Sequence, residues 1–198
     1  MKTPGNDPKQ QGRGYIGVAV RQAIEFIEAR GLTAKVRADA SPAALAQIDK
    51  PPGMMAWQDA AVLDELETLL EKHGGRSACV DLGLHAARKL GSGIVAPVLK
   101  FALQLFGNSP ATLLGNLDRF YSMVTKGLTY GYEAVGDKQG LVILTAEGPS
   151  IPRAFFDVTR GNLLYMLELT GTKGTVDAPK IRTTTDRSTV VEYRVGWE

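Results

Sequence analysis

The sequence predicts an α+β fold, in which an N-terminal helical layer packs on a four-stranded antiparallel sheet. Two observations support this class. Up to about residue 126, apolar residues recur at helical spacing. From residue 127 the order becomes strand–strand–helix–strand–strand, a β-β-α-β-β unit whose strands are joined by short turns typical of antiparallel pairing.

Composition sets the broad class. A length of 198 residues fits one domain, and 44% apolar with 22% charged residues is typical of a globular protein. The formal net charge of +2 supplies no field that would attract nucleic acid, so we expect no nucleic-acid partner. One cysteine rules out an internal disulfide, and two histidines leave little material for a metal site.

The polar residues 1–14 predict a disordered tail, followed by a single domain over 15–198 with a helical part (15–126) and a sheet part (127–198). No apolar segment follows Met1 as in a secretory signal. The longest apolar stretch, 94–106, is too short to cross a bilayer. We therefore expect a cytoplasmic protein without a membrane span.

The helical part begins with an amphipathic helix over 16–30. Ser41 and Pro42 then start a short helix, as cap and first residue. The next helix, 57–73, has a stripe of leucines, and its acidic residues are expected on the outside: Asp64, Glu65, Glu67 and Glu71.

Three further helices complete this part. The segment 77–90 is closed by glycines, and 94–106 is apolar on nearly all sides, which predicts a buried central helix. Ser109 and Pro110 open another helix, expected to run to about Lys126.

The sheet part has two predicted hairpins. Residues 128–135 and 141–146 form the first, and a long helix over 152–170 follows. The second turns around Asp186 and Arg187. Its last strand alternates, with one face made of Val191, Tyr193, Val195 and Trp197.

The motif G-x-G-x-x-G occurs at residues 12–17. Dinucleotide binding by this motif requires a strand before it and a parallel crossover after it. Neither is expected here, so we interpret the glycines as part of the flexible tail.

The residues that most often bind metals have simpler explanations in this chain. His85 is expected to be a partly buried structural histidine, and His73 to cap a helix C-terminus. Cys79 is expected to be a small buried hydrophobe, because no second cysteine is present to resolve an oxidised thiol. We therefore predict no metal site.

No catalytic motif is visible. No Ser/His/Asp grouping, Walker A or H-E-x-x-H sequence occurs. Asp118, Glu133 and Asp157 either converge near a cleft or lie on helix surfaces. We predict that the protein is not an enzyme.

Aromatic residues gather in the last 80 residues, on segments that should pack together. They form either an aromatic-rich core or the lining of an apolar ligand pocket. Arg153 and Arg160 would then meet a ligand carboxylate or phosphate, or else lie at the surface. With these arginines, the candidate pocket consists of Phe120, Tyr121, Tyr130, Tyr132, Phe156 and Tyr165.

Three stretches carry a family resemblance: residues 110–121, 152–161 and 167–197, the last ending in Tyr193-Arg194-Val195-Gly196-Trp197. They resemble an uncharacterised bacterial family of similar length with many myxobacterial paralogues. Its members end in an aromatic-x-Val-x-Trp strand.

That family in turn resembles the superfamily of haem-NO-binding sensors, vinyl-reductase-type ligand-binding domains and TRAPP subunits. The resemblance implies a cavity for haem, lipid or another hydrophobic ligand. In the haem sensors, the segment like 116–121 ends in the iron-binding histidine, where this chain has Tyr121. The Tyr-x-Ser-x-Arg triplet that holds haem propionates is also missing. We therefore expect no haem, although phenolate can ligate haem iron.

A looser likeness to ligand-sensing domains of AraC-type regulators involves residues 81–83 and 110–121. No helix-turn-helix follows, so direct DNA binding is not expected.

These observations together predict a non-catalytic sensing or signalling adaptor domain for an apolar small molecule, acting as a homodimer or with a partner protein. The ligand would lie beneath the helix 152–170 and enter between it and the helix 109–126. The alternative is a protein-interaction module with a filled core, using the hairpin 128–146 or the helix 94–106. A haem-based gas sensor is a more remote alternative.

Overall fold

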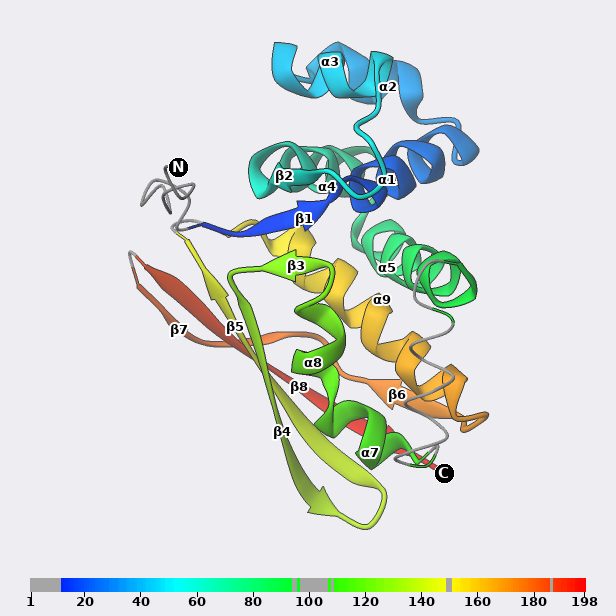
Figure 1. The fold of residues 1–198 in the computed structure, drawn as a ribbon, viewed down its shortest axis with the longest axis vertical. Helices are drawn as coiled ribbons and strands as arrows, with labels where there is room; N and C mark the ends of the chain where they lie inside the picture. Colours follow the sequence, from blue (N-terminus) through cyan, green and yellow to red (C-terminus); the bar gives the residue numbers. More distant parts are fainter. Residues whose placement is uncertain (1–11, 94–95, 97–106, 108, 149–150, 186) are drawn as a thin grey trace, which may run out of the picture.

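The computed structural model describes residues 12–93, 96, 107, 109–148, 151–185 and 187–198. The expected helix over 94–106 and most of the expected N-terminal tail lie outside these residues. In Figure 1 the helices of residues 17–92 lie above and behind the main sheet, and the helix α9 (Arg153–Leu169) runs between them and the sheet.

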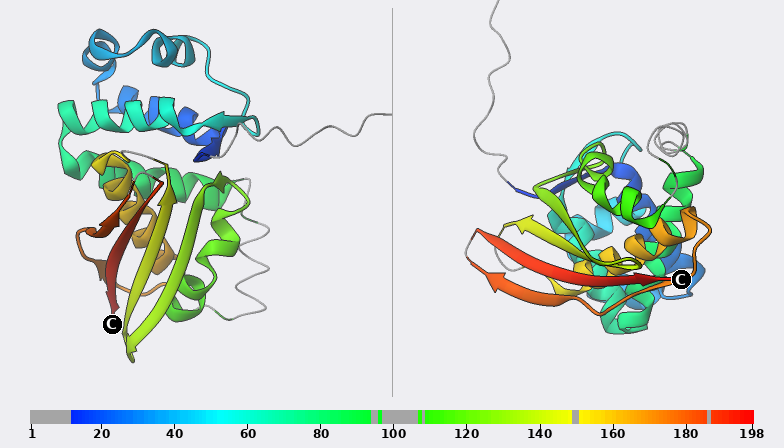
Figure 2. Two further views of the ribbon diagram at one scale, coloured as in Figure 1. Left: turned by 90° about the vertical axis from the view of Figure 1, so that its left-hand side faces the viewer. Right: turned by 90° about the horizontal axis from the view of Figure 1, so that it is seen from below.

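Between residues 12 and 93 the structure has five helices: α1 (Gly17–Ala29), α2 (Thr33–Asp39), α3 (Pro42–Asp49), α4 (Ala60–Gly74) and α5 (Arg76–Ser92). The pair α2 and α3 covers the outer side of α1 and α4, away from the sheet (Figure 2). Ser41 caps α3 as predicted, because its hydroxyl accepts a hydrogen bond from the amide of Ala44. The helix α2 was not predicted.

A small antiparallel sheet ties the start of the chain to the rest. Its strands β1 (Gly14–Ile16), β2 (Trp57–Asp59) and β3 (Thr125–Lys126) have β1 in the centre. This corrects two predictions. Arg13 and Gly14 are buried rather than part of a disordered tail, and the segment starting at residue 57 is a strand before α4 begins. Asp59 caps α4 by accepting the amide of Ala61.

The main sheet contains β4 (Leu128–Gly136), β5 (Gln139–Glu147), β6 (Gly174–Val176), β7 (Lys180–Thr184) and β8 (Ser188–Trp197). All described pairings are antiparallel, in the order β4–β5–β8. Both β6 and β7 pair with the free side of β8, one after the other along its length. Because β6 and β7 share one side of β8, the five described strands occupy four positions across the sheet. Helices packed on an antiparallel sheet confirm the predicted α+β class.

The alternation predicted for the last strand is also confirmed. Val191, Tyr193 and Val195 are fully buried against α9, while Arg194 is exposed. The hydroxyl of Tyr193 donates to the carbonyl of Phe156 at 3.0 Å, which fixes the position of α9 on the sheet.

The prediction of one continuous helix from Ser109 to about Lys126 is wrong. The chain forms α7 (Pro110–Gly115) and α8 (Leu117–Tyr121), and then enters β3. Between the helices, the side-chain amide of Asn116 donates to the carbonyl of Thr112 at 2.9 Å. Asp118 then accepts the backbone amide of Tyr130, so that α8 is held against β4.

The helices α5 and α9 cross with their backbones in contact. A Cβ atom at Gly83 would lie 1.9 Å from the carbonyl oxygen of Val158, and one at Gly161 would lie 2.0 Å from that of Val80. Both positions therefore require glycine for steric reasons. This crossing joins the helical part to the sheet part. The proposed single domain over 15–198 stays a prediction.

Among the described residues, no helix combines the length and the apolar character needed to cross a membrane.

Candidate ligand cavities

A cavity lies where α1, α5 and α9 meet β1 and the start of β4. Its volume is about 80 Å³, which is enough for several waters or a small organic molecule. Its wall is mostly aliphatic and aromatic, with Ala19, Leu63, Leu82 and Phe155 among the lining residues. It also contains Glu67, and we name it the Glu67 cavity.

A second cavity of about 80 Å³ adjoins the first, between the end of α5, α8 and α9. Phe120, Met123, Tyr165 and Met166 line it, and we name it the Tyr165 cavity. The two cavities share the lining residues Leu90, Tyr121, Val124 and Asn162. They are therefore neighbouring compartments along one face of α9.

Four of the predicted pocket residues line these cavities. Tyr130 lines the Glu67 cavity, Phe120 and Tyr165 line the Tyr165 cavity, and Tyr121 lines both. The rings of Tyr121 and Tyr130 stack with centroids 4.7 Å apart. Burial raises the pKa of both phenols above its ordinary value, so both are neutral.

The other four predicted pocket residues line neither cavity. Phe156 is buried under Tyr193, and Tyr132 packs over Gly140 between β4 and β5. Arg153 is exposed near Asp157, and Arg160 donates to the carbonyl of Val176 at 2.7 Å. The structure therefore places no predicted arginine at the cavities.

The structure does not bring Asp118, Glu133 and Asp157 together in one cleft. Asp118 holds β4, as described above, and Glu133 is exposed on β4. Asp157 is buried and accepts two hydrogen bonds from Arg76, at 2.8 and 2.9 Å. Each has a structural explanation of its own.

The sequence analysis missed a buried polar cluster at one wall of the Glu67 cavity. Arg13 pairs with Asp64, donates to the hydroxyl of Tyr15 at 3.1 Å, and lies over the ring of Phe155. Glu67 follows Asp64 by three residues on α4 and is only 3% exposed. Its Oε2 atom is buried without a hydrogen-bond partner among the described residues.

Burial shapes the electrostatics of this cluster. It raises the pKa of Glu67 well above the ordinary value, and the nearby Asp64 raises it further, while Arg13 opposes the shift. Burial also raises the pKa of Asp64, against the effect of Arg13. Because Arg13 is held by Asp64, the protonated form is favoured more strongly at Glu67 than at Asp64.

The predicted position of Glu67 on the outside of α4 is wrong. Glu67 follows Leu63 by four residues and precedes Leu70 by three, so it lies on the leucine stripe that faces the core. This spacing was the available signal, since an acidic residue within an apolar stripe points to a polar group in the interior.

Asn162 is the second polar group of interest. It lies on α9 and lines both cavities. Its side-chain amide has no hydrogen bond within the part of the chain that the structure describes. It could therefore contact a molecule in either cavity.

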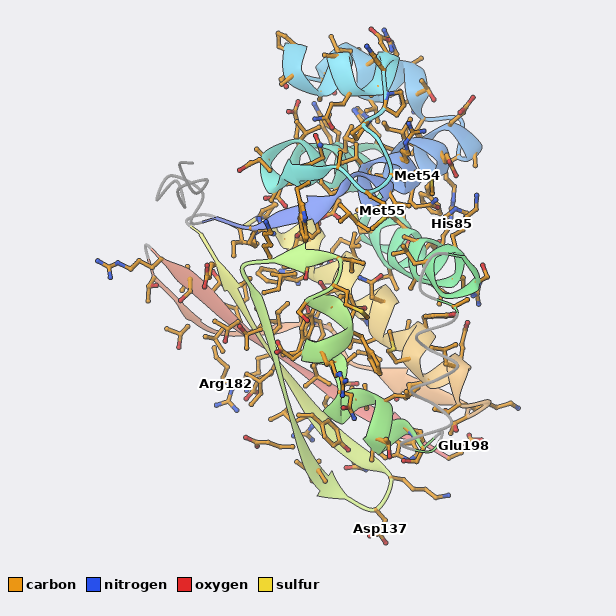
Figure 3. All side chains as sticks on the ribbon, viewed as in Figure 1. Met54, Met55, His85, Asp137, Arg182 and Glu198 are labelled. Carbon is orange, nitrogen blue, oxygen red and sulfur yellow. The ribbon has the colours of Figure 1, made fainter. Side chains whose placement is uncertain are left out.

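The two histidines and the cysteine do not line either cavity. His73 is 2.7 Å from a carboxylate oxygen of Asp39, and His85 packs against Phe26 on the outer side of α5 (Figure 3). Cys79 is buried and donates to the carbonyl of Glu67 at 3.7 Å. No group of three or more His, Cys, Asp or Glu in the described ranges could hold a metal ion.

No protein-family model matches the sequence, and no curated protein matches it. Solved structures of H-NOX proteins do match the fold. The Fe(II) unliganded H-NOX protein from K. algicida has a TM-score of 0.65 at 9% identity, covering 92% of this chain and 96% of that one. A double variant of the Tt H-NOX protein has a TM-score of 0.64 at 12% identity, covering 92% and 95%.

An oxygen-binding H-NOX domain related to soluble guanylate cyclases, in its oxygen complex, has a TM-score of 0.62 at 10% identity, covering 92% and 94%. The chain therefore has the H-NOX fold, which confirms the predicted likeness to the haem-NO-binding superfamily. At these identities the comparison shows the fold alone.

Proposed function

We propose that this protein is a non-catalytic sensing or adaptor domain that binds a small, mostly apolar molecule in the Glu67 and Tyr165 cavities. The observation that carries the proposal is the pair of adjoining, apolar-lined cavities along α9. Concave apolar sites with a few polar groups are typical of small-molecule binding. This supports the ligand-binding alternative over a module with a filled core.

The position of the cavities supports signalling. Both are bounded on one side by α9, which also packs on α5 and contacts β6 and β8 of the sheet. A ligand that fills them would favour one position of α9 over another. A partner protein or a second copy of the chain would then sense this shift.

Haem does not fit the residues present, although H-NOX neighbours include proteins studied for heme distortion. The chain has only two histidines, His73 and His85, and neither lines a cavity. Tyr121 lines both, but its raised pKa disfavours the phenolate that would ligate iron. The described lining residues also contain no Arg or Lys to pair with propionates. We therefore propose an organic ligand without haem.

One observation favours a protein contact as a second function. Met54, Met55 and Trp57 are 49, 59 and 43% exposed. Met54 and Met55 lie beside the start of α1 (Figure 3), and Trp57 pairs with Ile16 just before it. Exposed apolar side chains that are neighbours in the fold are typical of contact surfaces. The hairpin formed by β4 and β5 has one large exposed apolar residue among those described, Val135.

Native mass spectrometry tests the proposed function. We expect the purified protein to carry an excess mass that disappears on denaturation. Ala86→Phe should abolish it by filling the Glu67 cavity, since Ala86 lines that cavity from α5. Ala29→Phe, at an exposed position of α1, should retain it. An excess mass retained by Ala86→Phe would contradict the assignment to this cavity, and a mass equal to haem would overturn the argument against haem.

A further inference from the structure

Two carboxyl groups and one guanidinium lie together beside the Glu67 cavity. Glu67 is buried and Asp64 is partly buried beside it, and among the described residues Arg13 is the cation that influences both carboxyl groups. The guanidinium of Arg13 is held by Asp64 and by the hydroxyl of Tyr15. Glu67 is therefore left without an ionic partner of its own.

Glu67 lines the cavity with one carboxyl oxygen that has no hydrogen bond to any described residue. Glu67 is 3% exposed, it belongs to the cavity lining, and its Oε2 atom has no partner among the described residues. The lining residues with hydroxyl groups, such as Tyr15 and Thr159, do not donate to this atom, and the apolar ones cannot. A buried polar group of this kind is costly unless another group supplies the missing hydrogen bond.

The chemistry of the ligand follows from the charge of the site. A cationic ligand would require Glu67 to ionise, and two charges would then have to lose their water in an apolar cavity. A neutral ligand requires neither, because burial raises the pKa of Glu67 and so favours its protonated form. The O–H of a carboxylic acid is a donor, so the complementary ligand group is an acceptor.

We infer that Glu67 determines the specificity of this cavity by donating a hydrogen bond to a carbonyl or ether oxygen of an otherwise apolar ligand. This inference rests on the proposed function, because it names the class of molecule that the cavity takes. Asn162 supplies a second polar contact for ligands that extend into the Tyr165 cavity.

Three probes of nearly equal shape test the inference: cyclohexanone, methylenecyclohexane and cyclohexylamine. Their dissociation constants are measured by NMR titration at pH 7 against the wild type, Glu67→Gln and Glu67→Leu. The control is Glu28→Leu, which removes an exposed carboxylate from α1. Thermal unfolding of each variant checks that it is folded.

We expect the wild type to bind cyclohexanone about tenfold more tightly than methylenecyclohexane, as one hydrogen bond would provide. Glu67→Gln should keep this preference because its amide also donates, and Glu28→Leu should leave it unchanged. Glu67→Leu should bind both probes equally. If Glu67→Leu does not fold, the comparison of the wild type with Glu67→Gln still decides between the ketone and the amine.

Two results would overturn the inference and leave the proposed function intact. One is equal binding of ketone and hydrocarbon by the wild type. The other is tightest binding of cyclohexylamine that is lost in Glu67→Gln, which would show that Glu67 acts as a carboxylate. If no probe binds the wild type, the proposed function fails together with the inference.

Discussion

The two cavities have similar volumes but walls of different character. Glu67 and Tyr15 line the Glu67 cavity, and behind them Arg13 is fixed by Asp64 and by the hydroxyl of Tyr15. The Tyr165 cavity is lined by longer apolar side chains, among them Met123 and Met166. Methionine side chains adapt their shape easily, whereas a buried network of charges allows few arrangements.

This difference indicates that the Glu67 cavity selects a ligand by its polar group, whereas the Tyr165 cavity accommodates ligand groups of different shapes. A ligand group at Glu67 has to satisfy one defined hydrogen bond, and a mismatch leaves a buried polar group unpaired. A ligand group in the Tyr165 cavity has to fill space, and the side chains there can move to receive it. Changes at the Glu67 cavity should therefore cost more than changes of similar size at the Tyr165 cavity.

The largest effect is expected from Arg13→Met. It leaves the partly buried Asp64 and the buried Glu67 without the cation that pairs with them among the described residues, and removing one partner of a buried ion pair costs about 3–5 kcal/mol. Urea unfolding at pH 7 measures the loss. Arg37→Met is the control, since its pair with Asp49 is exposed and should contribute less than about 1 kcal/mol. Equal losses for the two variants would show that the cluster at the Glu67 cavity is solvated.

A medium effect that depends on pH is expected from Glu67→Gln. In the wild type, folded Glu67 keeps its proton above the ordinary pKa of 4.5, while the unfolded chain releases it. The free energy of unfolding of the wild type should therefore fall with rising pH relative to the variant, by up to about 1.4 kcal/mol per pH unit, until the pKa of the folded state is reached. Asp64 and Arg13 face Glu67 in both proteins.

Urea unfolding of both proteins from pH 4 to pH 8 gives this difference. A difference that does not change with pH would mean that Glu67 titrates normally in the folded protein. The inference about its ligand would then lose its physical basis.

The smallest effect is expected from Gly91→Ala, at the Tyr165 cavity. Its new Cβ would lie 1.8 Å from the hydroxyl oxygen of Tyr165, which is the far end of a side chain and can move aside. Since alanine also favours the helix, the free energy of unfolding should stay within about 1 kcal/mol of the wild type.

Gly83→Ala on the same helix is the matched control for this prediction. Its Cβ would lie 1.9 Å from the carbonyl oxygen of Val158, and the backbone of α9 cannot yield as a side chain does. We expect a loss of about 3 kcal/mol by thermal or urea unfolding. Similar losses for Gly83→Ala and Gly91→Ala would contradict the view that the Tyr165 cavity adapts.

Much of the fold could be predicted because local patterns agree with it. The hairpin of β4 and β5, the long helix α9 and the alternation along β8 all follow from periodicity and turn residues. The prediction failed where a short pairing replaced a helix. Nothing local in residues 57–59 or 125–126 indicates a strand, because both are strands only through pairing with β1.

The candidate site was predicted less well, for a related reason. Tyr121, Tyr130 and Tyr165 were recognised from aromatic content, and they do line the cavities. Arg13 was missed because it was assigned to a polar tail, and its partner Asp64 is 51 positions away. A pairing at such separation leaves no trace in the periodicity of either segment.

The sequence by itself determined the class of fold, the turn and cap positions, and the limited set of metal-binding residues, since each depends on local spacing or on composition. Only the tertiary structure decided that Glu67 faces a cavity and that Arg13 belongs to Asp64. It also decided that Gly83 and Gly161 bring α5 and α9 into backbone contact. These features depend on the meeting of distant segments, where burial sets the energies of polar groups and sterics sets the distance between helices.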